Sequence, residues 1–147
     1  MTNLSVNVNK IAWLRNARGE NRPNLIEMSK ILIESGVHGL TVHPRPDLRH
    51  ITPDDVYDLS ILCADNKVEF NIEGNPYSEQ TKIYPGFLNL VKEIMPDQCT
   101  LVPDSPDQLT SDHGWEIQAK DHNAVRNIVE EIQTDKTRVS FFVDPNI

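Results

Sequence analysis

Residues 68–73, Val68-Glu69-Phe70-Asn71-Ile72-Glu73, alternate between apolar and polar side chains, which is the pattern of a β-strand with two different faces. The same alternation occurs in residues 4–8, 39–43 and 138–143 and, less regularly, in residues 98–102. The sequence therefore predicts five strands, each with one apolar and one polar face.

Segments with helical signals separate these strands. Residues 24–35 begin with Asn24 and Glu27, spaced as in a capping box, and Gly36 provides a C-terminal stop. The run Thr52-Pro53-Asp54-Asp55 combines an N-cap, a proline at the first helical position and an acidic first turn. The other expected segments are a helix from Phe87 that Pro96 ends, a helix that carries Val125 to Ile132, and a basic loop over residues 14–19.

The order βαβαβαβαβ predicts a parallel sheet with right-handed crossovers. Parallel strands that helices cover on both faces are normally continuous apolar runs, so the polar faces need another explanation. A sheet curled into a barrel, apolar toward the helices and polar inside, accounts for them. The sequence therefore predicts an α/β fold of the (β/α)8 TIM-barrel type, with an open doubly wound sheet as the alternative.

The chain is short for such a barrel. A complete barrel takes about 250 residues, whereas these 147 residues supply about five strands and four helices. We expect residues 1–147 to be the N-terminal part of a single barrel domain that is incomplete in this chain. The alternatives are a paralogue that lost its last third and a five-stranded open α/β domain. An incomplete barrel exposes two strand edges, so pairing with another chain is expected.

Composition argues against several classes of protein. A hydrophobic content of 38% and a charged content of 24% are typical of a globular protein. The formal net charge of -8 argues against a nucleic-acid partner, which needs a basic surface. The sequence has no apolar run of membrane-spanning length and no signal-peptide pattern, so we expect no membrane association and a cytoplasmic location. Cys63 and Cys99 lack metal or redox spacing and are expected to be core thiols.

The densest chemical feature is His43-Pro44-Arg45-Pro46-Asp47-Leu48-Arg49-His50, which directly follows a predicted strand. Imidazoles exchange protons near neutral pH, and guanidiniums bind phosphate or carboxylate. Asn9, His43 and Glu73 all lie at carboxyl ends of predicted strands, where barrels carry their reactive groups. We therefore expect a site that binds an anionic substrate and moves protons on it; a solvated polar loop is the alternative. The neighbouring arginines argue against a metal site at His43 and His50.

Several collinear motifs then point to one enzyme family. They are Val6-Asn7-Val8-Asn9-Lys10-Ile11-Ala12, Leu14-Arg15-Asn16-Ala17-Arg18-Gly19, Gly39-Leu40-Thr41-Val42-His43, Arg49-His50-Ile51, Asn71-Ile72-Glu73, Leu101-Val102-Pro103 and Val139-Ser140-Phe141-Phe142-Val143-Asp144. On these motifs the chain resembles the pyridoxine 5'-phosphate synthase family from Leu4 to about Asp144, which is the first three-fifths of that family's barrel.

The resemblance implies an enzyme that condenses 1-deoxy-D-xylulose 5-phosphate with 3-amino-2-oxopropyl phosphate, releasing phosphate and water, without a metal or an organic cofactor. It implies that His43 and Glu73 are catalytic proton acceptors. The implied substrate-binding residues are Asn7 and Arg18 for the aminoketone phosphate, and Asn9, Lys10, Arg45, His50 and Thr110 for the deoxyxylulose phosphate. The resemblance also implies small phosphorylated substrates as partners and a homo-oligomeric state. Arg15 is expected to be structural, paired with an acidic residue.

Two departures from the family pattern limit these expectations. Asn9-Lys10 stands where many family members carry Asp-His, which removes a carboxylate and replaces an imidazole by an amine. The family's late glutamate, proton-donor histidine and glycine-rich phosphate loops have no counterpart in these 147 residues. We therefore expect an incomplete site and an inactive chain. A non-catalytic phosphosugar-binding or assembly module derived from the same barrel is the alternative.

Overall fold

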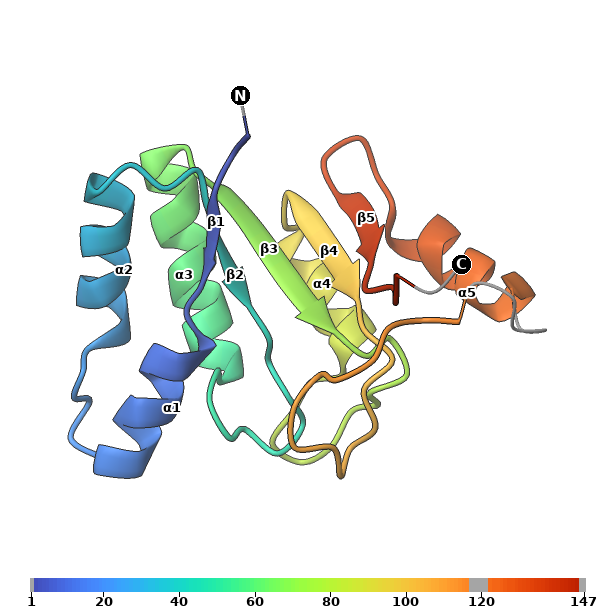
Figure 1. Ribbon diagram of the computed structural model, residues 1–147, viewed down its shortest axis with the longest axis horizontal. Helices are drawn as coiled ribbons and strands as arrows, with labels where there is room; N and C mark the ends of the chain where they lie inside the picture. Colours follow the sequence, from blue (N-terminus) through green and yellow to red (C-terminus); the bar gives the residue numbers. More distant parts are fainter. Residues whose placement is uncertain (1, 117–121, 146–147) are drawn as a thin grey trace.

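The computed structural model describes residues 2–116 and 122–145 of the chain. The elements, in order, are β1 (Ser5–Asn7), α1 (Asn9–Arg18), α2 (Leu25–Glu34), β2 (Gly39–Val42), α3 (Pro53–Asn66), β3 (Glu69–Gly74), α4 (Phe87–Ile94), β4 (Gln98–Leu101), α5 (His122–Ile132) and β5 (Arg138–Phe141). The five strands form one parallel sheet in the order β1-β2-β3-β4-β5 (Figure 1).

The order of the strands confirms the predicted barrel-type α/β fold. Each strand pairs with the next one along the chain, so the sheet grows in one direction only. An open doubly wound sheet reverses direction at a switch point, and no reversal occurs here. The sheet does not close on itself, and β1 and β5 form its two edges. The described residues therefore form the incomplete barrel that the sequence predicts.

The prediction of four helices is wrong, because residues 14–19 are not a loop: α1 covers Asn9–Arg18, which makes five helices in the described residues. Ala12 is fully buried, whereas Trp13 and Leu14 are exposed. The apolar side chains of α1 therefore form no single stripe that periodicity could reveal. Gly19, with a φ of 78°, ends the helix.

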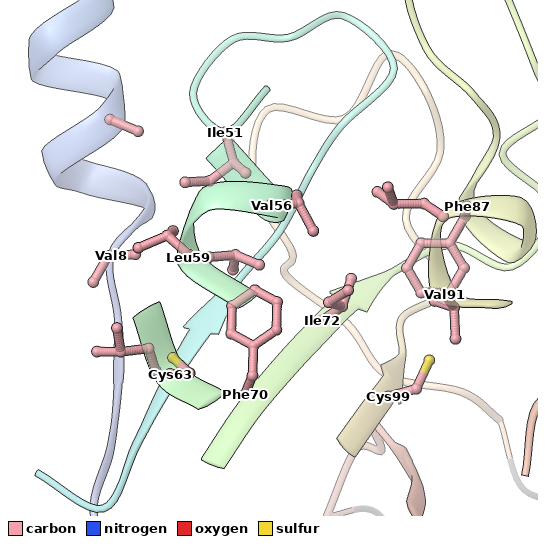
Figure 2. Close-up of a cluster of buried hydrophobic side chains, with 14 of the residues drawn as sticks. Val8, Ile51, Val56, Leu59, Cys63, Phe70, Ile72, Phe87, Val91 and Cys99 are labelled. Carbon is pink, nitrogen blue, oxygen red and sulfur yellow. The ribbon is translucent and has the colours of Figure 1, made fainter. Parts of the chain in front are cut away.

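One face of the sheet packs against the helices. Figure 2 shows apolar side chains of α3 and α4 directed toward those of β3 and β4. Phe70, Ile72 and Val91 are at most 2% exposed, and burying each such side chain contributes about 1.5–3 kcal/mol. Cys63 and Cys99 belong to the same cluster as free thiols, which confirms that they are core residues.

The opposite face carries a continuous hydrogen-bonded row of polar side chains, one from each strand. Ser5 and Thr41 hydroxyls lie 2.9 Å apart, and Asn71 Nδ2 donates to Thr41 Oγ1 at 3.3 Å. Thr100 Oγ1 lies 3.0 Å from Asn71 Oδ1 and 2.7 Å from Ser140 Oγ. The row gives each of these polar groups a hydrogen-bond partner, including the buried Thr41 and Asn71, and it confirms the predicted alternation of apolar and polar faces.

The predicted start of α3 is also confirmed. The amide of Asp55 donates to Thr52 Oγ1 at 3.2 Å, and the Asp55 carboxylate accepts from the amide of Thr52 at 2.8 Å. The loops that follow β2, β3 and β4, together with α1 after β1, gather at the carboxyl ends of the strands (Figure 1). Every residue of the predicted site except Arg18 lies at this end of the sheet, in these loops or in the first turn of α1.

Candidate active site

Asparagine side chains connect the ends of β1, β2 and β3. Asn7 Nδ2 donates to Glu73 Oε1 at 2.8 Å, and Asn7 Oδ1 accepts from the amide of Asn9 at 2.9 Å. Asn9 Oδ1 in turn accepts from the amide of His43 at 2.8 Å. These bonds tie Glu73 and His43 to one frame. In this structure Asn9 positions the backbone of His43.

His43 is buried, with Arg45 and Arg49 nearby and one acidic side chain 3.9 Å from each ring nitrogen. Burial first, and then the charges of Arg45 and Arg49, lower the pKa of His43 to about 3. The imidazole is therefore neutral at physiological pH, and each ring nitrogen keeps the ability to accept or donate. Glu73 Oε1 lies 3.9 Å from His43 Nδ1. A neutral imidazole beside a carboxyl group can act as a proton acceptor.

The surroundings of Glu73 raise its pKa, whereas those of His43 lower the pKa of the imidazole. Burial raises the pKa of Glu73 to about 7, the negative charge of Asp104 adds to the increase, and hydrogen bonds from Asn7 and Asn9 oppose it. A carboxyl group with a pKa near neutrality can both give and take a proton at physiological pH. His43 and Glu73 thus form a pair in which the acid can be protonated while the imidazole is not.

Arg45 is nearly buried, and its guanidinium is already engaged. Its Nη2 forms an ion pair with the Asp104 carboxylate, and its Nη1 donates to the carbonyl of Gln108 at 2.7 Å. The backbone carbonyl of Gln108 also accepts from Arg49 Nη1 at 3.0 Å. Two guanidiniums therefore hold the segment of residues 105–113, which carries Thr110, across the carboxyl ends of the strands.

His50 is fixed by its own backbone and by α1. Its Nδ1 accepts from the amide of Ile51 at 2.9 Å, so that nitrogen carries no proton. Burial, followed by the charges of Arg45 and Arg49, lowers the pKa of His50 to about 4. Its ring centroid lies 6.1 Å from that of His43. The two imidazoles therefore face the same space as neutral groups.

Arg15 confirms the expectation of a structural ion pair. Its guanidinium forms a bidentate pair with Asp55, at 2.5 and 2.8 Å, and donates to the carbonyl of His50 at 3.3 Å. The adjacent Asn16 donates to the same carbonyl at 2.8 Å. The last turns of α1 thereby hold the loop that carries His50.

Arg15→Gln is expected to lower the free energy of unfolding by about 2 kcal/mol, because hydrogen bonds to a charged partner are lost. The imidazole resonances of His50 should shift as its backbone loses a donor. Arg18→Gln, at an exposed position of the same helix, serves as the control and should leave stability and the His50 signals unchanged. Equal effects of the two substitutions in urea unfolding would contradict this assignment.

A cavity of about 750 Å³ lies among these groups. Eight of the nine predicted site residues line it: Asn7, Asn9, Lys10, His43, Arg45, His50, Glu73 and Thr110. The other lining residues, which the prediction did not include, are Trp13, Arg49, Leu109 and Ser111. Arg49 belongs to the His43–His50 stretch, so its arginine chemistry could have identified it. Arg18 is exposed at the C-terminal end of α1 and does not line this cavity.

Asp104 is the buried charged residue at this site that sequence reasoning missed. It follows Pro103 after β4, and its carboxylate pairs with Arg45. Its position just beyond a strand end was the available signal. Among the described residues, no cluster of three or more His, Cys, Asp or Glu side chains could hold a metal ion. No helix in the described part of the chain is long and apolar enough to cross a membrane.

Comparison with known proteins gives a consistent result. A family model with the description "Pyridoxal phosphate biosynthesis protein PdxJ" matches residues 4–147. Pyridoxine 5'-phosphate synthase of Xylella fastidiosa (strain 9a5c) is 52% identical over 146 residues, which are 99% of this chain and 56% of that protein. Pyridoxine 5'-phosphate synthase of Xanthomonas campestris pv. campestris (strain B100) is 52% identical over 143 residues, 97% of this chain and 56% of that protein. The chain thus spans a little over half the length of these relatives.

Proposed function

The chain belongs to the PdxJ family, and on that basis we propose that its strand-end cavity is part of a pyridoxine 5'-phosphate synthase active site. The proposed reaction condenses 1-deoxy-D-xylulose 5-phosphate with 3-amino-2-oxopropyl phosphate and releases phosphate and water. The observation that carries the proposal is the single cavity of about 750 Å³ that eight of the nine predicted residues line.

The proposed proton transfers use His43 and Glu73. Condensation, dehydration and ring closure each require a proton to leave one atom and reach another, which positioned imidazole and carboxyl groups can provide. A neutral His43 can accept a proton, and Glu73, with its pKa raised to about 7, can return one. The distance of 3.9 Å between His43 Nδ1 and Glu73 Oε1 supports this pairing.

The proposed phosphate contacts come from Lys10, Arg45, His50 and Thr110. Cationic and hydroxyl donors around one cavity are the groups that bind a phosphate ester. A bound phosphate would bring negative charge close to both imidazoles and so raise the pKa of His43 and His50 from the low values that burial imposes. Substrate binding would then prepare the imidazoles for proton transfer at neutral pH.

The phosphosugar-binding step can be tested with 1-deoxy-D-xylulose 5-phosphate and isothermal titration calorimetry. His50→Ala and Lys10→Ala are each expected to weaken binding about 10- to 100-fold, because each removes a donor to a charged group. Arg126→Ala, an exposed arginine of α5, is the matched control and should bind like the parent chain.

Turnover is measured separately, by mixing the protein with both substrates and following pyridoxine 5'-phosphate by absorbance. No binding of the phosphosugar, or binding that His50→Ala and Lys10→Ala leave unchanged, would contradict the proposal. Binding with turnover supports the synthase. Binding without turnover in the longest natural form of the protein supports the alternative of a non-catalytic phosphosugar-binding module.

The proposal extends to a homo-oligomer in the cytoplasm. Two buried free thiols, Cys63 and Cys99, suit a reducing compartment. Two open sheet edges, β1 and β5, suit an assembly in which other segments or chains cover them. Light scattering of the purified protein tests the oligomeric part of this proposal.

A further inference from the structure

Asp104 joins three loops at the carboxyl ends of the strands. Its Oδ2 accepts from Arg45 Nη2 and, at 2.6 Å, from Ser111 Oγ. Its backbone carbonyl accepts from Asn75 Nδ2 at 2.5 Å. The loops after β2, β3 and β4 therefore meet at one residue, through its carboxylate, which is 4% exposed, and through its backbone carbonyl. The bonds from Arg45 and Ser111 to Oδ2 hold the carboxylate in place.

The carboxylate of Asp104 also faces His43. Its Oδ2 lies 3.9 Å from His43 Nε2, while Glu73 Oε1 lies at the same distance from Nδ1. The imidazole is thus placed between two acidic side chains, one at each ring nitrogen. At 3.9 Å neither contact is a hydrogen bond, but catalytic hydrogen bonds that are long in a free enzyme often shorten when substrate binds.

One carboxylate oxygen of Asp104 remains available. Oδ1 is buried and has no hydrogen-bond partner among the described residues. An unsatisfied buried acceptor in a native protein calls for an explanation, and catalytic sites are one place where such groups occur. Asp104 therefore keeps acceptor capacity beyond its bonds with Arg45 and Ser111, although the oxygen that faces His43 Nε2 at 3.9 Å is Oδ2 and not Oδ1.

We propose that Asp104 is a positioning residue, which holds His43 as the tautomer with its proton on Nε2 and so leaves Nδ1 free toward Glu73. An ionised carboxylate only accepts hydrogen bonds, so it favours a proton on the nitrogen that faces it. A carboxylate selects the tautomer of the catalytic histidine in serine proteases by the same principle. The role in catalysis rests on the proposed function, because it matters only if His43 accepts a proton at Nδ1.

The tautomer can be measured directly in the free chain. Long-range 1H–15N correlation spectra at pH 7, with 15N-labelled histidine, distinguish a protonated from an unprotonated ring nitrogen, and His43→Gln assigns the signals. We expect a protonated Nε2 and an unprotonated Nδ1 in the parent chain. A protonated Nδ1 with an unprotonated Nε2 would overturn the proposal, whatever the variants do.

Three substitutions sharpen the test. Asp104→Asn removes the negative charge and replaces one carboxylate oxygen by an NH2 donor. We therefore expect the single Nε2–H signal to be lost. Asp104→Glu restores the charge and should recover the signal at least in part. Ser111→Ala removes one hydrogen bond but keeps the charge and the Arg45 pair, so it should leave the signal in place. A folded Asp104→Asn protein that retains the parent tautomer would refute the role of Asp104.

The two proposals can fail separately. The tautomer is read without substrate, whereas the proposed function is read from phosphosugar binding and its sensitivity to His50→Ala. Loss of the Nε2–H signal in Asp104→Asn, together with absent phosphosugar binding in the parent chain, would reject the function and retain the positioning of His43. Normal binding with an unchanged tautomer would reject the positioning alone.

Discussion

Replacing Arg45 by methionine is expected to lower the free energy of unfolding by about 3–5 kcal/mol, which is a large fraction of the stability of an ordinary domain. Arg45 and Asp104 are each 5% exposed. Removing the guanidinium leaves the Asp104 carboxylate buried without its ionic partner, and it also removes a donor to the Gln108 carbonyl. Urea unfolding at pH 7, followed by tryptophan fluorescence, measures the loss.

Arg138→Met is the matched control for Arg45→Met. Arg138 also pairs with a carboxylate, Glu69, at 2.6 Å, but the two side chains are 61% and 36% exposed. Exposed pairs contribute at most about 1 kcal/mol, so this substitution should cost little. Combining Arg45→Met with Asp104→Leu should recover much of the lost stability, because no unpaired charge then stays buried. If Arg45→Met lowers the free energy of unfolding no more than Arg138→Met does, the buried Arg45–Asp104 pair contributes no more to stability than an exposed pair.

The sequence predicted the sheet well because its signal is local. In β2 and β3 the alternation of side chains indicates which residues face the helices and which face the other side of the sheet. The structure has the same two faces. The capping residues of α3 likewise act within one turn. From strand ends alone it follows that Asn9, His43 and Glu73 meet, because parallel strands place their carboxyl ends at one edge.

The parts that were missed depend on contacts between distant residues. Helix α1 lacks a regular apolar stripe, since Trp13 and Leu14 are exposed, and its packing decides its structure. Asp104 stands in a loop rich in Pro, Ser and Asp, which resembles an ordinary polar loop. Only the three-dimensional contact with Arg45, 59 residues earlier, identifies it as a buried ion-pair partner. Local patterns contain no record of such a pairing.

Acidification is expected to destabilise the folded chain through His43 and, in the same direction, through His50, whose pKa burial lowers to about 4. The pKa of His43 is lowered to about 3 in the folded chain, against an ordinary value of 6.5 in the unfolded chain. Between these values the unfolded chain binds a proton that the folded chain does not, so acidification favours unfolding. The contribution of His43 is fully present above pH 6.5 and is lost as the pH falls toward 3. At pH 4.5 the loss amounts to about 2–3 kcal/mol.

Glu73 acts in the opposite direction over part of the same range. Its pKa is raised from 4.5 to about 7, so its contribution to stability is fully present below pH 4.5 and is lost as the pH rises through 7. On acidification from pH 7 to pH 4.5, His43 therefore destabilises the folded chain while Glu73 stabilises it. His43→Gln should flatten the loss of stability in this range, and Glu73→Gln should steepen it.

Urea unfolding at pH 7 and at pH 4.5 gives the change in stability for each variant, and the difference between variants isolates one residue from the other titrating groups. For His43→Gln the acid-induced loss should be about 2–3 kcal/mol smaller than for the parent chain. His113→Gln is the control, because His113 is exposed and its partner Asp112 raises its pKa rather than lowering it. The His113→Gln variant should not reduce the loss of stability between pH 7 and pH 4.5. An acid-induced loss that is the same in His43→Gln and the parent chain would mean that His43 binds its proton equally well in the folded and unfolded states, and its burial beside Arg45 would then not keep it neutral.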